Sequence, residues 1–146
     1  FYKMEIDIKI ATTNKDKEGC FSVRREVFVR EQNISEKVEF DDTNFNATYF
    51  IATYKNESVG TARYRFTDQG VKLERFAVLK SFRNLGVGKK LVDYITNIVK
   101  DEKFIYLHAQ ESVVEFYFKL GFKKIGSPFF EAEIPHQKMM YDQKFK

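Results

Sequence analysis

The chain has 146 residues and a hydrophobic fraction of 43%, which fits one folded domain over residues 1–146. Its 25 basic and 21 acidic residues give a net charge of +4. They are interspersed and therefore indicate a solvated surface, not a nucleic-acid partner. No apolar run approaches the ~20 residues of a membrane span, so no membrane partner is expected. The single cysteine, Cys20, cannot form an internal disulfide, and a reducing cytoplasm is the simplest compartment.

The first half of the chain begins with one strand and one helix and continues with strands alone. Residues 4–10 alternate apolar and charged side chains, the pattern of a half-buried strand. Residues 19–32 carry apolar side chains at helical spacing, which predicts a helix with Cys20 as a buried structural thiol. The polar stretch 33–46 is typical of a loop. Breaks at 56–57 and 68–70 then separate three expected strands, 48–54, 59–66 and 71–78.

The second half alternates helices with short strands. A glycine-containing loop over 81–88 opens a helix that runs to about residue 100, and residues 104–107 form a short apolar strand of the kind buried on both faces. These elements follow a three-stranded meander, so the sheet is expected to be mixed and not doubly wound.

A short helix is expected over residues 112–120. Ser112 takes the N-cap position with Glu115 in a capping box, and Gly121 ends the helix. Two last strands follow at 122–125 and 136–141. The whole order predicts an α+β fold, with a mixed and mostly antiparallel sheet flanked by helices.

The segment from Arg83 to Lys89 carries the clearest chemical signal, because it lies between a strand and a long helix. The first N–H groups of a helix lack intrahelical acceptors, and the helix dipole adds positive charge there, so this segment can bind an anion. Gly86 and Gly88 have no Cβ atoms and let a phosphate approach the backbone. A P-loop is excluded because no Ser or Thr follows Lys90, and a dinucleotide fingerprint because position 91 is Leu. A glycine-rich helix start without a ligand is the alternative.

Two motifs together resemble the signatures of the GNAT acetyltransferase superfamily. The pattern Arg83-x-x-Gly86-x-Gly88, after a strand that ends in Phe-Ala-Val, is similar to its acetyl-CoA signature. Residues 116–122, Phe-Tyr-Phe-Lys-Leu-Gly-Phe, are similar to its second signature, in the expected order and at the expected distance. The resemblance covers nearly the whole chain. Three further segments resemble the ElaA-like branch of the superfamily: 27–32, 39–42 and 134–136.

This resemblance implies the GNAT-type acyl-CoA N-acyltransferase fold and acetyl-CoA as co-substrate. In that family the sheet opens between its fourth and fifth strands, here residues 71–78 and 104–109. The pantetheine arm lies in the opening, and an amine on the other side attacks the thioester directly. The residues expected to bind acetyl-CoA are Phe76, Ala77 and Val78 on the strand and Arg83, Asn84, Leu85, Gly86, Val87, Gly88 and Lys89 in the loop.

The resemblance makes Tyr117 the acid that protonates the departing thiolate. On the residues alone, a packing aromatic is the favoured interpretation, because clustered aromatics at helical spacing usually belong to a core. Glu74 is the candidate base or amine-orienting group. Strand alternation would place Glu74 with Lys72 and Phe76 on one face, with Arg75 on the other. Partial burial would raise the pKa of Glu74, whereas a nearby Arg75 or Lys72 would lower it. Its alternative role is a surface ion pair.

Three more residues are candidates for the acceptor side. Arg63 and Arg75 could bind an anionic part of the acceptor. His136 could act as a base, oriented by Glu131 or Glu133, or could make a structural hydrogen bond. With one cysteine and two histidines, no metal site is expected.

The leading hypothesis is therefore an enzyme that moves the acetyl group of acetyl-CoA to a primary amine of a small molecule or a protein. The alternative is an acyl-CoA-binding module without catalysis. A nucleic-acid binder would require salt-dependent affinity, which the scattered charges do not favour. The identity of the acceptor, the base and the assembly, including a homodimer, stay open.

Overall fold

The computed structural model describes residues 5–40 and 46–142. Its elements are β1 (Asp7–Ile10), α1 (Asn14–Arg24), the π-helical η1 (Arg25–Glu31), α2 (Glu36–Glu39), β2 (Thr48–Tyr54), β3 (Glu57–Phe66), β4 (Val71–Val78), the 3₁₀ turn η2 (Lys80–Phe82), α3 (Val87–Val99), β5 (Ile105–Gln110), the 3₁₀ turn η3 (Glu111–Val113), α4 (Val114–Phe118), β6 (Phe122–Lys124), β7 (Phe129–Glu131) and β8 (Ile134–Tyr141).

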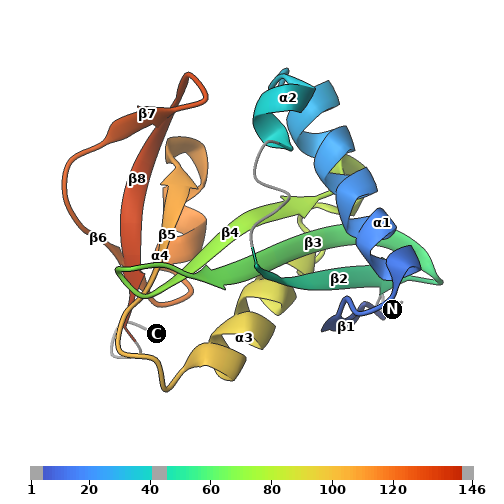
Figure 1. Cartoon of the computed structure of the whole chain (residues 1–146), viewed down its shortest axis with the longest axis horizontal. Helices are drawn as coiled ribbons and strands as arrows, with labels where there is room; N and C mark the ends of the chain where they lie inside the picture. The colour runs from blue at the N-terminus through green and yellow to red at the C-terminus, as the bar shows by residue number, and fades with distance from the viewer. Residues whose placement is uncertain (1–4, 41–45, 143–146) are drawn as a thin grey trace.

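The described strands form one eight-stranded sheet in the order β1-β2-β3-β4-β5-β8-β6, with β7 paired to β8. Within these residues only the β4–β5 pair is parallel. Figure 1 shows α1 and α2 over one side of β2, β3 and β4, and α3 on the other side. The predicted α+β class with a mixed, mostly antiparallel sheet is confirmed.

The two faces of the sheet pack against different helices because side chains alternate along each strand. On β2, Phe50 joins the main core with Leu91 of α3, and its neighbour Ile51 packs with Cys20 of α1. Cys20 is fully buried, and its Sγ lies 3.4 Å from the carbonyl oxygen of Phe50. The predicted buried thiol is confirmed, and burial raises its pKa above the ordinary value.

The N-terminal helix begins five residues earlier than the apolar pattern indicated. Thr13 caps α1 by accepting a hydrogen bond from the backbone N–H of Asp16 at 3.0 Å, and Asp16 completes a capping box. The helix continues as η1 to Glu31. The expected loop after it contains the single-turn helix α2, which Ser35 caps through the N–H of Val38 at 3.1 Å; residues 41–45 lie outside the described part.

Two hairpin turns differ from the predicted ones. The β2–β3 turn is Lys55–Asn56, not 56–57, and both residues have positive φ, 49° and 68°. Strand β7 was not predicted; a two-residue turn, Ala132–Glu133, joins it to β8 with φ values of 50° and 62°. Residues at two successive positive φ angles are usually glycine or asparagine. The Ala-Glu pair therefore gave no turn signal in the sequence.

The short helix after β5 begins differently from the prediction. Residues 111–113 form the 3₁₀ turn η3, so the N-cap of α4 is Val113, without a side-chain hydrogen bond, and Ser112 is not a cap. Gly121 ends the segment with a φ of 102°, as predicted.

Gly60 on β3 lets α3 approach the sheet closely. A Cβ atom there would lie 3.0 Å from Val87 Cγ1 and 3.3 Å from Leu91 Cδ1. We expect Gly60→Val to lower the free energy of unfolding by about 1–3 kcal/mol, because the added methyl groups overpack this contact. Urea denaturation measures the change, with Glu57→Val on the exposed end of the same strand as the control. Equal stability of the two variants would contradict this packing.

Candidate active site

The strands β4 and β5 separate after a short parallel ladder. They pair at Val71–Ile105, Lys72–Tyr106 and Leu73–Leu107, and both strands then continue without pairing to each other. A cleft of about 890 Å³ occupies the opening and is lined from both strands. The first residues beyond the last pair are Glu74 on β4 and His108 on β5, here called the lip residues. This geometry matches the opening that the family resemblance implied between the fourth and fifth strands.

A β-bulge at Arg75 decides which way the side chains of β4 point. Arg63 of β3 faces Glu74 and Thr61 faces Ala77, so one residue of β3 opposes two residues of β4. Arg75 has a φ of 57° at this point. Alternation is interrupted here, and the expected grouping of Glu74 with Phe76 is wrong.

Beyond the bulge, the side chains of β4 separate by face. Phe76 and Val78 pack against the core under α3, and Ala77 packs with Val27 and Phe28 of η1. Arg75 reaches α2, where its Nε lies 3.2 Å from Glu39 Oε2. Glu74 and Arg75 therefore lie on the α1 side of the sheet, and Phe76 on the α3 side.

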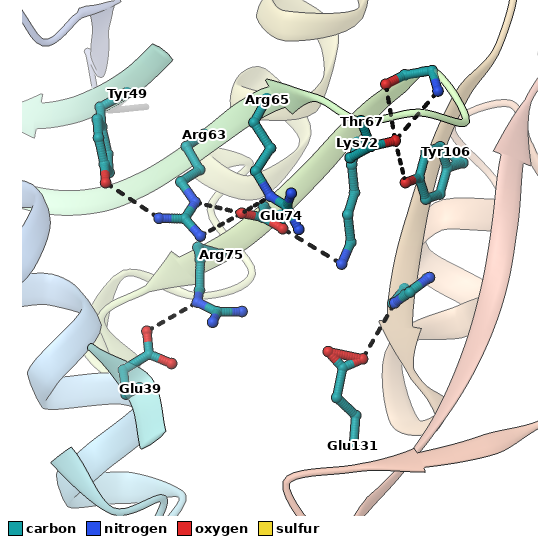
Figure 2. Close-up of polar contacts among 12 residues, drawn as sticks. Glu39, Tyr49, Arg63, Arg65, Thr67, Lys72, Glu74, Arg75, Tyr106 and Glu131 are labelled. Atoms are coloured by element: carbon teal, nitrogen blue, oxygen red, sulfur yellow. Dashed lines mark hydrogen bonds and ion pairs between the residues drawn. The ribbon is translucent and has the colours of Figure 1, made fainter. Parts of the chain in front are cut away.

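Glu74 is the centre of a cluster of positive charges (Figure 2). Its Oε2 accepts hydrogen bonds from Arg63 Nε at 2.6 Å and Arg65 Nε at 3.1 Å, and its Oε1 lies 3.5 Å from Lys72 Nζ. Arg63 is fully buried and also donates to the hydroxyl of Tyr49 at 3.2 Å. Arg63 does not line the cleft, whereas Glu74 does.

Burial and neighbouring charges act in opposite directions on the pKa of Glu74, and the charges decide its direction. Burial alone would raise the pKa of this carboxyl. The positive charges around it, those of Arg63, Lys72, Arg65 and Arg75, outweigh burial and lower its pKa below the ordinary range. A carboxylate held in its charged form by several cations is a poor proton acceptor.

The loop before α3 offers a row of backbone donors to the cleft. No backbone N–H from Asn84 to Lys89 donates to a backbone acceptor within the described residues, and the first such bond is Lys90 N–H to Gly86 O at 3.0 Å. Gly86 takes the N-cap position of α3 in the left-handed conformation, with a φ of 88°. This backbone arrangement is compatible with the anion site that the glycine pattern suggests, and the binding itself stays a prediction.

The side chains of this loop contribute less charge than the sequence suggested. Arg83 donates to the carbonyl of Val78 at 2.9 Å and makes two hydrogen bonds to Glu31 at 2.5 and 2.7 Å. The hydrogen bonds to Glu31 raise the pKa of Arg83 and lower that of Glu31. Lys89 pairs with Asp93 at 2.7 Å. Arg83 therefore ties the loop to β4 and η1.

Most of the predicted acetyl-CoA residues meet in the cleft, and one does not. The lining includes Phe76, Ala77, Val78, Arg83, Asn84, Gly86, Val87, Gly88 and Lys89. Leu85 is absent from it and is half exposed at 49%. The segment η1 forms another part of the wall, with Phe28 and Glu31.

Tyr117 of α4 lies on the α3 side of the opening. It packs edge-to-face against Phe76 and Phe122, with centroid distances of 5.8 and 5.9 Å. It is 7% exposed, and burial raises its pKa well above the ordinary value. Its hydroxyl makes no hydrogen bond to any residue in the described part of the chain, although Tyr117 lines the cleft.

The wall opposite Glu74 contains a polar group that sequence reasoning missed. Glu131 at the end of β7 has Oε2 3.2 Å from Nδ1 of His108. The sequence made Glu131 a candidate to orient His136. The Nδ1 of His136 instead lies 2.7 Å from the carbonyl oxygen of Ile134, two residues earlier on the same strand. Figure 2 shows Glu131 across from Lys72 and Arg75. The long-range contact had no sequence signal, because β7 was not predicted.

Comparison with known proteins identifies the family. Residues 12–143 match the family model described as "Acetyltransferase (GNAT) domain". The chain belongs to the GNAT acetyltransferase family. The predicted enzyme class, an acetyl-CoA-dependent acetyltransferase, is confirmed by this membership.

Individual relatives agree with the family. The Bacillus subtilis (strain 168) protein named "Uncharacterized N-acetyltransferase YjcF" is 36% identical over 137 residues, which span 91% of this chain and 97% of that protein. The crystal structure of Escherichia coli ElaA is 25% identical, with a TM-score of 0.77 and coverage of 95% and 99% of the two chains. An acyl-CoA N-acyltransferase from Pseudomonas aeruginosa has the same fold, with 23% identity, a TM-score of 0.80 and the same coverage. The resemblance to the ElaA-like branch is thus confirmed.

No group of three or more His, Cys, Asp or Glu side chains within the described residues is arranged to hold a metal ion. None of the helices in the same residues is long and apolar enough to cross a membrane.

The buried pair between Glu74 and Arg63 leads to a stability prediction. Glu74→Gln leaves the fully buried Arg63 without its carboxylate, so we expect the free energy of unfolding at neutral pH to fall by about 3–5 kcal/mol. A carboxyl with a lowered folded pKa stabilises the fold above its unfolded pKa, ~4.3, and loses that contribution as the pH falls through the folded value. The gap between parent and variant should therefore shrink in acid.

Urea denaturation at neutral and acid pH measures this gap. The control is Glu102→Gln, an exposed change that should stay within about 0.5 kcal/mol of the parent. A Glu74→Gln protein as stable as this control at pH 7 would show that the pair is not a structural support.

Proposed function

We propose that this chain transfers the acetyl group of acetyl-CoA directly to a primary amine of a small molecule or a protein. The observation that carries the proposal is the cleft itself. It connects the row of backbone donors before α3 with the lip residues Glu74 and His108, so a thioester bound by its phosphates would reach polar side chains. No residue of the chain needs to carry the acetyl group, because the two substrates meet in one opening.

The acetyl-CoA side of the proposal uses the backbone. The N–H groups from Asn84 to Lys89 would bind the pyrophosphate, supported by the dipole of α3. The pantetheine arm would lie along the free edge of β4 at Phe76, Ala77 and Val78, where β5 has moved away. Arg83 would hold the loop in place through Val78 and Glu31.

Tyr117 is proposed as the acid for the departing thiolate. Its aromatic surroundings disfavour both a phenolate and a free thiolate, so the proton would move as negative charge reaches the sulfur. The thiolate sulfur gains the phenol proton, and the phenolate regains a proton from the nitrogen that has attacked. The new amide nitrogen thus ends neutral, and coenzyme A leaves as a thiol.

The acceptor would approach from the α1 side, where Glu74 and Arg75 lie. In this arrangement Glu74 keeps the cationic residues of β3 and β4 in place, and Arg75 at the cleft wall would contact an anionic part of the acceptor. Arg63 supports Glu74 from beneath, because it is buried away from the cleft.

A thiol-release assay with acetyl-CoA across a panel of amines tests this function. Release that depends on the amine, with the acetylated product identified by mass spectrometry, is expected. Binding of acetyl-CoA without release for any small amine or peptide would favour the non-catalytic binding module.

Two glycines with matched surroundings test the phosphate loop. Gly86 and Gly126 both have positive φ, 88° and 72°, and a Cβ at either would meet nothing within 4 Å. We expect Gly86→Ala to weaken acetyl-CoA binding at least about tenfold, or ~1.4 kcal/mol, because the Cβ and the strained φ disturb the phosphate donors. Gly126→Ala should carry similar strain and leave affinity unchanged. Calorimetry that finds equal affinities for both would refute the loop assignment.

Replacement of the acid separates binding from chemistry. Tyr117→Phe keeps the ring contacts with Phe76 and Phe122 and removes only the hydroxyl. We expect unchanged acetyl-CoA affinity and a turnover ~10²–10⁴-fold slower in single-turnover measurements. A single-turnover rate within a factor of about two of the parent would remove Tyr117 from this role.

A further inference from the structure

We propose that His108 is the general base that deprotonates the amine, and that Glu131 is the positioning residue that orients its ring. This inference rests on the proposed acetyl transfer and assigns a residue to its acceptor side. The lowered pKa of Glu74 leaves that role without a suitable carboxylate, and His108 is the other lip residue.

His108 occupies the first position of β5 beyond the parallel ladder, so it lies at the point where the opening begins. Its side chain lines the cleft and is 25% exposed, enough to meet a substrate but not fully solvated. It lies on the same strand face as Tyr106 and Gln110, opposite to the core residues Leu107 and Ala109. Gln110 bonds Gln32 at the end of η1 at 2.9 Å, which places this face toward the acceptor side.

Hydrogen bonding defines which ring nitrogen of His108 is available. Glu131 is a carboxylate and can only accept, so the Nδ1 of His108 is the donor in the 3.2 Å contact. In the neutral ring Nε2 then carries the lone pair. This Nε2 makes no hydrogen bond within the described residues, and the edge-to-face contact with Phe129, at 4.9 Å, holds the ring from one side.

Glu131 is suited to support a charge on that ring. The hydrogen bond from His108 is the main cause that lowers the pKa of Glu131 to about 2, assisted by the charges of Lys72, His108 and His136 against the effect of burial. The carboxylate therefore stays negative at any pH at which an amine is acetylated, and it stabilises the imidazolium that forms.

His136 is the competing base, and its surroundings differ. Its Nδ1 donates to a backbone carbonyl, Ile134 O, and not to a carboxylate, so Glu131 acts on this ring only through space and does not orient it. It is 9% exposed and stacks on Phe129 at 5.9 Å. In the sheet it opposes Gln110, two residues beyond His108 and farther from the start of the opening.

The proposed step transfers one proton. An ammonium R–NH₃⁺ at the cleft loses an N–H proton to Nε2 of His108, which leaves a neutral amine and an imidazolium paired with Glu131. The amine nitrogen then forms the bond to the acetyl carbon as the C–S bond breaks. His108 later releases its proton to solvent, which accounts for the one proton that the overall reaction produces.

Amine basicity provides the decisive test. Ethylamine and 2,2,2-trifluoroethylamine have similar shapes, but at neutral pH the first is protonated and the second is largely neutral. We expect His108→Gln to lower kcat/KM for ethylamine ~10²-fold or more and to affect trifluoroethylamine only a few-fold, because the neutral amine needs no base before attack. Equal losses for both amines would reduce His108 to a residue that shapes the pocket and would overturn the proposal.

The positioning role of Glu131 is tested by the pH profile of kcat/KM for ethylamine, the amine that needs the base. Loss of the carboxylate disfavours the protonated ring of His108. In Glu131→Gln the acidic limb of the profile should therefore move to lower pH, and the maximum of kcat/KM should fall. Glu131→Asp should restore part of the limb position and part of the maximum. Glu133→Gln, in the neighbouring turn and exposed, is the matched control. An acidic limb that stays in place in Glu131→Gln would overturn the positioning role.

Other titratable or charged groups lie on the elements packed around His108 and its cleft, and the variants above leave all of them unchanged. They are Tyr106 on the same strand, His136 and Lys138 on β8, Lys72, Glu74 and Arg75 on β4, and Glu39 on α2. A basicity-dependent loss found in His136→Gln but not in His108→Gln would transfer the role to His136.

If the unaltered protein acetylates no amine, the proposed function itself fails. If it acetylates an amine and His108→Gln retains its rate on ethylamine, only this inference fails.

Discussion

The early end of the β4–β5 ladder is the constraint on which the site depends. Three residue pairs join the only parallel strands of the described sheet, and everything beyond Leu73 and Leu107 is free to line a cleft. An unpaired strand edge inside a domain leaves backbone groups in need of partners. A ligand that pairs like a strand would satisfy them, which is the arrangement proposed for the pantetheine arm. The loop before α3 then lies where the phosphates of such a ligand would end.

The bulge at Arg75 converts this opening into two chemically different sides. It places Phe76 beside Tyr117 among apolar rings, and it leaves Glu74 and Arg75 on the side of α1 and α2. A buried cationic cluster would be unstable there without Glu74, and its carboxylate is therefore committed to structure. This explains why the most conspicuous carboxylate of the cleft is a weak candidate for proton transfer.

Local patterns were enough to predict much of this architecture from sequence. The bounds of β2 and β4 agree with the predicted strands because alternation and flanking turns are local signals, and the glycines of the 83–88 segment predicted a loop that opens a helix. The bulge arises from pairing between β3 and β4 and cannot be found from one strand's alternation. His108 and Glu131 are 23 residues apart in the chain, and their contact depends on the glycine-free turn Ala132–Glu133. No local sequence pattern therefore predicts it.

The division of the cleft also gives a reason for the proposed acid and the proposed base to lie on opposite faces of the sheet. Direct transfer requires the attacking nitrogen to lose protons and the departing sulfur to gain one, at nearly the same time and within one opening. A base next to the acid would exchange its proton with it. Tyr117 lies on α4 among phenylalanine rings, and His108 lies on the other face beside Glu131, with the strand edges between them. Apolar surroundings keep the phenol protonated, and a carboxylate supports the protonated imidazole, so each group is stabilised in the state that its side of the reaction requires.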